Sequence, residues 1–148
     1  MSLLLLFGGS SVALGFKPAI AAALKADPTL SAIIAGRVNP VKLGQGQTYP
    51  ALRFAVVSRS YSHDLDGFAG TVDASVEFTA ESTLYSDVEA IIHAVRSIFD
   101  GFQGLLSGVR VNFALARDDS DDYAPSEDAG DDGTFTDSIT ILFSYVLI

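Results

Sequence analysis

The side chains of this sequence that could most readily bind ions or take part in acid–base chemistry are carboxylates that gather in one stretch. That stretch holds eight of the 18 acidic residues of the chain: Asp118, Asp119, Asp121, Asp122, Glu127, Asp128, Asp131 and Asp132. Carboxylates at alternating positions can bind calcium, but an EF-hand loop also needs a glycine at its sixth position and a glutamate at its twelfth. Counted from Asp119, the alternation reaches Asp121 and then Tyr123, and no glycine follows at the required place. We therefore expect a solvated acidic loop over residues 118–133, which meets a basic partner surface or repels like charge, with an adventitious divalent site as the alternative.

The other side chains capable of acid–base or nucleophilic chemistry do not form a catalytic arrangement. His63 and His93 are the two imidazoles of the chain. We place His63 at a hairpin tip, which is a poor position for excluding water, and His93 on the polar side of a helix. The chain has no cysteine and no Gly-x-Ser-x-Gly turn that would expose a serine nucleophile. The sequence thus predicts no enzymatic activity, no cofactor and no metal site; an enzyme would need a pocket that converges on His63 or on the acidic loop.

Composition limits the remaining classes of protein. With 148 residues, of which 49% are hydrophobic and 18% charged, the chain is expected to fold as one domain with a substantial core. A net charge of −9 with singly scattered basic residues argues against nucleic-acid binding, because phosphate contacts need clustered Lys and Arg. No stretch approaches the ~20 apolar residues that a membrane span requires.

The element that must organise these side chains is a helix over residues 86–99. Its apolar residues recur every three or four positions and so share one face: Val88, Ile91, Ile92, Val95, Ile98 and Phe99. Alternating segments over 71–82 and 109–114 flank the helix and predict half-buried strands. A one-sided helix between such strands must lay its apolar stripe across a sheet.

Further elements are predicted on both sides of this centre. A helix is expected over residues 17–26, followed by a short second helix through residue 34 that Asp27 caps. A short extended piece over 37–41 and strands over 51–61 and 134–148 complete the pattern. The strands over 51–61 and 71–82 are long enough for a hairpin that reaches beyond the body of the domain. Gly101 stands where a helix C-terminal glycine belongs.

Three segments have the exposed apolar or glycine-rich character expected of subunit contacts. The first is an N-terminal extension over residues 1–16, whose apolar run would be a liability on a free monomer. The second is a glycine-rich loop over 43–50, and the third is the turn of the long hairpin. We expect interface contacts at Leu3, Leu4, Leu5, Leu6, Phe7, Gln45, Gln47, Tyr49, Asp64, Leu65, Asp66 and Phe68.

Several short motifs, taken in order, resemble one known family. They are Gly36-Arg37-Val38-Asn39-Pro40, Gln45-x-x-x-Tyr49-Pro50-Ala51, Leu65-Asp66-Gly67, Tyr85 with the helix that follows it, and Asp100-Gly101-Phe102-x-Gly104. Their order and spacing are similar to those of the tail completion and tail terminator proteins of long-tailed phages and gene transfer agents. The resemblance covers roughly residues 17–117 and the final strand.

The resemblance implies a fold. Residues 17–148 would form a single α+β domain with a mostly antiparallel or mixed sheet of four to five strands. This sheet would pack against one main helix and short N-terminal helices.

The resemblance also implies a role, that of a structural virion protein without enzymatic activity. Six copies would form a ring that caps the head-proximal end of the tail tube, stops tube polymerisation and joins a head connector or stopper protein. Particles would assemble in the host bacterial cytoplasm, and DNA would pass through the ring without specific binding. A head-completion or connector protein at the head–tail interface is the alternative.

Overall fold

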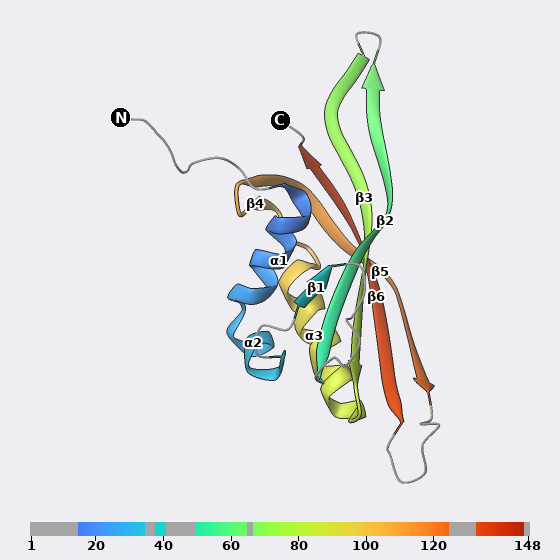
Figure 1. Ribbon diagram of the computed structural model, residues 1–148. Helices are drawn as coiled ribbons and strands as arrows, with labels where there is room; N and C mark the ends of the chain where they lie inside the picture. The colour runs from blue at the N-terminus through green and yellow to red at the C-terminus, as the bar shows by residue number, and fades with distance from the viewer. Residues whose placement is uncertain (1–14, 35–37, 41–49, 65–66, 125–132, 147–148) are drawn as a thin grey trace.

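The computed structural model describes residues 15–34, 38–40, 50–64, 67–124 and 133–146. Within these ranges the chain forms three helices and six strands (Figure 1). The helices are α1 (Phe16–Ala26), α2 (Pro28–Ile34) and α3 (Tyr85–Phe99). The strands are β1 (Val38–Pro40), β2 (Ala51–Asp64), β3 (Gly67–Ser82), β4 (Gly104–Leu106), β5 (Val109–Ala124) and β6 (Thr134–Val146). The expected α+β class is confirmed.

The core is built around α3, as its apolar spacing predicts. The buried face of α3 packs on β3 and β6. Phe99 lies in an aromatic cluster there: its ring stacks on that of Phe78 and meets that of Phe143 edge-on, both at 5.3 Å between ring centroids. All three side chains are fully buried, so this cluster joins the helix to the two central strands.

The end of α3 is joined to the sheet by two hydrogen bonds. Gly101 follows the helix in the left-handed conformation, with φ of 82°. Its N–H donates to the Ala114 carbonyl on β5 at 2.7 Å. The Asp100 carboxylate accepts a second hydrogen bond from the Ala116 N–H at 2.9 Å. The Asp-Gly pair therefore ends the helix, as predicted, and also fixes it to one edge of β5.

The two N-terminal helices pack beside α3. Helix α1 begins at Phe16, whose ring stacks on that of Tyr145 at 4.1 Å and meets that of Phe143 edge-on at 5.3 Å. The Asp27 carboxylate accepts a hydrogen bond from the Leu30 N–H at 2.9 Å, so it caps α2 as predicted. Among the described helices, none has the length and apolar composition needed to cross a bilayer.

The strands form one mixed sheet in the order β1-β2-β3-β6-β5-β4. Neighbouring strands are antiparallel except for β1 and β2, which are parallel. Four of the strands are long, while β1 and β4 have three residues each. The short strand β4 adds to the predicted set, because the sequence analysis did not separate it from the glycine-rich turn after α3.

The long strands extend beyond the helices in two opposite directions (Figure 1). At one end, the pairing of β6 with β3 stops at Val146. Beyond this point, β2 and β3 continue together as a hairpin. We call residues 62–64 and 67–70 the hairpin arm. At the other end, β5 pairs with β6 over residues 118–124 and 134–140, which we call the acidic arm. The predicted reach of the β2–β3 hairpin is thus confirmed.

The acidic arm corrects one expectation. The sequence analysis places residues 118–133 in a loop, which is wrong for residues 118–124, because they continue β5. Aspartate only weakly disfavours strands, and pairing along the whole first half of β6 outweighs that preference. The remainder of the expected loop, residues 125–132, lies outside the described residues.

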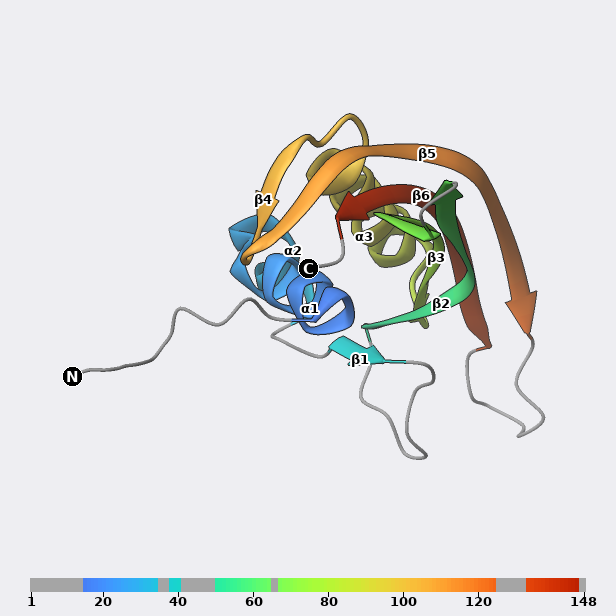
Figure 2. The same ribbon diagram turned by 90° about the horizontal axis from the view of Figure 1, so that it is seen from above.

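The helices cover a single face of the sheet, which curls around them (Figure 2). In the part of the chain that the structure describes, no helix covers the opposite face. On β3 and β6 this uncovered face is polar: it carries the acids Asp73, Glu77 and Glu81 and many short side chains, among them Thr71, Ser75, Thr79, Thr136, Ser138, Thr140 and Ser144. Strands of alternating pattern with one buried and one polar face are typical of a sheet packed on one side only.

Candidate interface surfaces

Most of the residues predicted at subunit contacts lie outside the described residues. These are Leu3, Leu4, Leu5, Leu6, Phe7, Gln45, Gln47, Tyr49, Leu65 and Asp66. Asp64 and Phe68 lie at the end of the hairpin arm, where Phe68 pairs with His63 and Asp64 with Gly67. Contacts at these positions stay a prediction.

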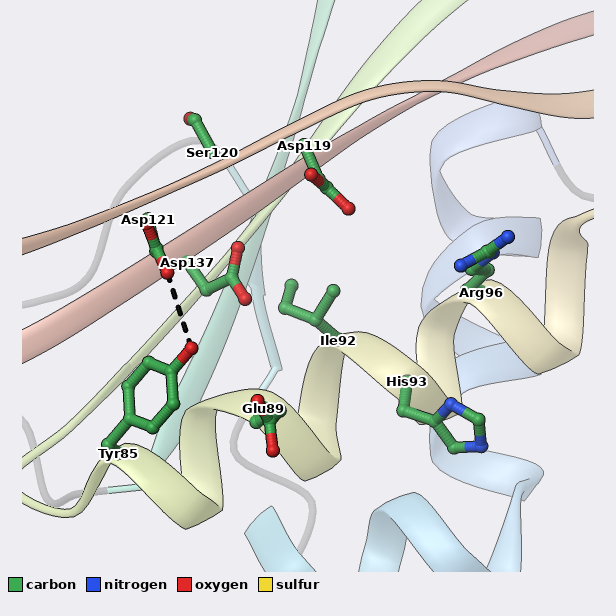
Figure 3. A pocket seen from close by; sticks show the side chains of 9 residues that line it. All are labelled: Tyr85, Glu89, Ile92, His93, Arg96, Asp119, Ser120, Asp121 and Asp137. Carbon is green, nitrogen blue, oxygen red and sulfur yellow. Dashed lines mark hydrogen bonds between the residues drawn. The ribbon is translucent and has the colours of Figure 1, made fainter.

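A groove of about 360 Å³ separates α3 from the acidic arm (Figure 3). It is lined by Tyr85, Glu89, Ile92, His93 and Arg96 from α3, Asp119, Ser120 and Asp121 from β5, and Asp137 from β6. Figure 3 shows three strand carboxylates lying over the helix, with the Tyr85 hydroxyl directed at one of them, Asp121, and Glu89 on the helix below. We call this the acidic groove. Its carboxylates come from segments far apart in the sequence, which the β5–β6 register brings together.

Two of these carboxylates oppose each other directly across the strands. Asp121 pairs with Asp137 in the β5–β6 ladder. Burial raises the pKa of Asp137 from its ordinary value to about 6, and the charges of Asp119 and Asp121 contribute to this rise. Like charges in directly opposed positions destabilise a sheet. The acidic arm is therefore folded against its own electrostatic repulsion.

An aromatic cluster continues the acidic groove toward the end of the arm. The Phe135 ring meets that of Tyr85 edge-on at 5.6 Å and that of Tyr123 at 4.6 Å between centroids. The Tyr85 hydroxyl donates a hydrogen bond to the Asp121 carboxylate at 3.3 Å. This hydrogen bond and the charge of Asp121 raise the pKa of Tyr85 above its ordinary value. The end of the arm thus combines exposed aromatic surface with negative charge.

Carboxylates outnumber basic side chains in the lining of the acidic groove. Arg96 is the arginine among its lining residues. Its Nε atom lies 3.8 Å from Oδ2 of Asp100, which is not part of the groove lining. His93 is exposed, as expected for the polar side of the helix. In the ranges that the structure describes, no three His, Asp or Glu side chains are placed to hold one metal ion. A negative groove with an aromatic end is suited to contact with a basic protein surface.

The long strands on both sides of the sheet carry exposed apolar side chains. On β2, Val57 is 57% exposed and Tyr61 46%. On β5, Leu115 is 49% exposed and Tyr123 47%. These four side chains lie on the two long strands next to the ends of the sheet and do not form one continuous patch. The sequence analysis missed these four residues, and no local signal in the sequence marks them as exposed strand positions.

Fold and surfaces together define an assembly subunit, with one covered sheet face, two projecting arms and apolar residues on both outer long strands. The sequence profile of the family described as tail completion protein gp17 matches residues 18–128. The chain belongs to this family, and its role is a structural one in a phage-type particle.

One solved structure shares the fold over nearly the whole chain. It is a chain of a structure described as the virion of a native gene transfer agent particle, with a TM-score of 0.56 and 16% sequence identity. The match covers 88% of this chain and 92% of that one. No curated protein matches the sequence.

Proposed function

We propose that this protein forms a ring, of six copies, on the head-proximal end of a tail tube. The ring ends tube polymerisation and presents the surface to which the head connector or stopper protein binds. The observation that carries this proposal is the family match over residues 18–128, since the family is described by its role in completing the tail. No enzymatic step is part of the proposal.

Two features of the chain support a position between tube and head. The hairpin arm and the acidic arm project from opposite ends of the domain, so one copy can contact components on both sides (Figure 1). The net charge of −9 also suits a ring through which DNA passes without binding, because like charge keeps the duplex from adhering.

Electron microscopy of particles made without this gene tests the proposal. Tubes of uncontrolled length, detached from filled heads, are the expected result. Tails of normal length lying beside heads would assign the protein to head–tail joining alone, which is the role of a head-completion or connector protein. Intact particles of normal appearance would contradict both roles.

The proposed passage of DNA has a separate test. Asp118 and Asp122 pair with Thr140 and Thr136 of the uncovered face, away from the acidic groove. Replacing these two acids with asparagine should slow DNA ejection if the negative charge keeps the duplex free. Unchanged ejection from variant particles of normal morphology would count against this part of the proposal.

A further inference from the structure

The two outermost strands of the described sheet, β1 and β4, each cover only part of the long strand beside them. Strand β1 pairs with β2 only at residues 52–54, and β4 pairs with β5 only at residues 109–111. The hydrogen bonds from the turn after α3 occupy the edge of β5 at Ala114 and Ala116. Among the described strands, none pairs with the outer edge of β2 over residues 55–64 or of β5 over 117–124. Open edges of this length invite another strand.

We infer that the outer edge of β2 in one copy pairs with the outer edge of β5 in the next copy. This inference rests on the proposed ring and names the contact that closes it. The four long strands alternate in direction along the sheet. Two copies in the same orientation therefore bring β5 of one antiparallel to β2 of the other, which continues the alternation across the junction.

Charge favours this junction over contact between two β5 edges. The open edge of β5 carries four acids, Asp118, Asp119, Asp121 and Asp122, and one arginine, Arg117, whereas that of β2 carries Arg59 and Asp64. Contact between two β5 edges would oppose acids to acids. A contact between β2 and β5 is favoured instead, and such a head-to-tail contact generates a ring when its rotation closes.

The register of the sheet shows which shift between copies would bring Arg59 of one copy to Asp121 of the next. We call a set of residues that pair with one another across the four long strands a row. One row contains Ala55 on β2, Glu77 on β3, Thr140 on β6 and Asp118 on β5. Counted along β3, Arg59 lies three rows to one side of this row and Asp121 three rows to the other. Both face the helix-bearing side, because their rows contain the buried residues Ala74 and Ala80 of β3. A shift of six rows between copies therefore sets Arg59 opposite Asp121 of the next copy.

This shift is compatible with a closed ring. Six rows correspond to ~20 Å along the strands, and the four strand spacings of one copy to ~19 Å across them, which gives a strand tilt of about 45°. Strands in closed barrels tilt by roughly 35–45°. On the uncovered face, the same shift places Ser60 opposite Ser120 of the next copy.

Because the chain has no cysteine, a disulfide can report this pair without background. The full chain carrying Ser60→Cys and Ser120→Cys is put into particles, which are oxidised and analysed on a non-reducing gel. Opposed strand residues meet the spacing that a disulfide requires, so we expect a ladder of covalent multimers. The control carries Ser60→Cys with Ser97→Cys, an exposed position on α3, and should stay monomeric.

Charge exchange provides the second measurement. Arg59→Asp or Asp121→Arg alone should weaken self-association of the purified chain about tenfold, and the two together should restore it. Restoration separates loss of the contact from loss of folding.

Two outcomes would overturn the inference while leaving the ring in place. One is a ring seen by imaging in which the chain carrying Ser60→Cys and Ser120→Cys does not cross-link. The other is a double charge exchange that fails to restore association. Particles in which imaging finds no ring of this protein would overturn the proposed function together with the inference.

Discussion

At the scale of single residues, the acidic arm shows how a surface can be kept negative at a cost in stability. Asp137 lies opposite Asp121 and is partly withdrawn from water, which is why its pKa is raised to about 6. A fully exposed carboxylate would carry the same charge without that penalty. We expect the cost to be recovered when a basic side chain, such as Arg59 of a neighbouring copy, approaches the pair.

The Asp137→Asn variant tests this penalty. In the wild type, the folded-state pKa of about 6 exceeds the ordinary value of 3.8, so the folded state binds the proton more tightly. The stability from this group is fully present below pH ~4 and is lost as the pH rises toward 6. We expect Asp137→Asn to be more stable than the wild type by about 0.5 kcal/mol at pH 7, because the arm is solvated and its charges are screened.

The measurement is thermal unfolding of both proteins between pH 4 and 8. The difference between them should grow from pH 4 to 6 and then level off. Asp73→Asn, an exposed carboxylate on the uncovered face, serves as the control and should show no such growth. A constant difference across the whole range would show that the charge of Asp137 is not the cause.

At the scale of elements, the sequence predicted the helices and their buried faces well, but it did not predict the stretch of β5 that forms part of the acidic arm. The spacing of Val88, Ile91 and Val95 was sufficient to find α3, and Asp27 was correctly predicted to cap α2. Both predictions rest on interactions within a few residues. The strand identity of residues 118–124 depends instead on pairing with β6, and the acidic groove depends on the β5–β6 register, neither of which local pattern encodes.

The α3–β5 connection gives a prediction at this scale. Gly101→Ala should destabilise the protein by about 1 kcal/mol, because alanine is strained at φ 82° while its methyl group would meet no atom within 4 Å. The cost is then one of backbone conformation alone. Asparagine tolerates this conformation better, so Gly101→Asn should lose less stability in urea unfolding. Equal losses for the two variants would contradict the conformational explanation.

The packing of α1 on the sheet gives another prediction at the scale of elements. Phe16 is 7% exposed and contacts the rings of Phe143 and Tyr145, so Phe16→Ala should reduce the free energy of unfolding by about 3 kcal/mol. The neighbouring exposed Lys17→Ala should change it by less than ~0.5 kcal/mol. Urea denaturation of both variants provides the comparison. If Phe16→Ala had the same free energy of unfolding as the wild type, α1 would not unfold cooperatively with the rest of the domain.

At the scale of the whole molecule, the domain has the features of a subunit that is completed by its neighbours. Within the described residues, its sheet leaves long stretches of the outer edges of β2 and β5 without a strand partner, and exposed apolar residues lie on those same two strands. The short strands β1 and β4 cover too little of the edges to protect them. The resemblance noted in the sequence identified the family correctly, but it relied on motifs in turns and helix ends and therefore did not identify these edges.

The central claim is that copies of this chain close into a ring at the head-proximal end of the tail. Electron cryo-microscopy of the head–tail junction of intact particles tests it most directly. We predict a closed ring of density between tube and head, into each subunit of which this fold fits with β2 beside β5 of the next copy. Density for this fold at another place in the particle, or as isolated copies that do not touch, would contradict the account.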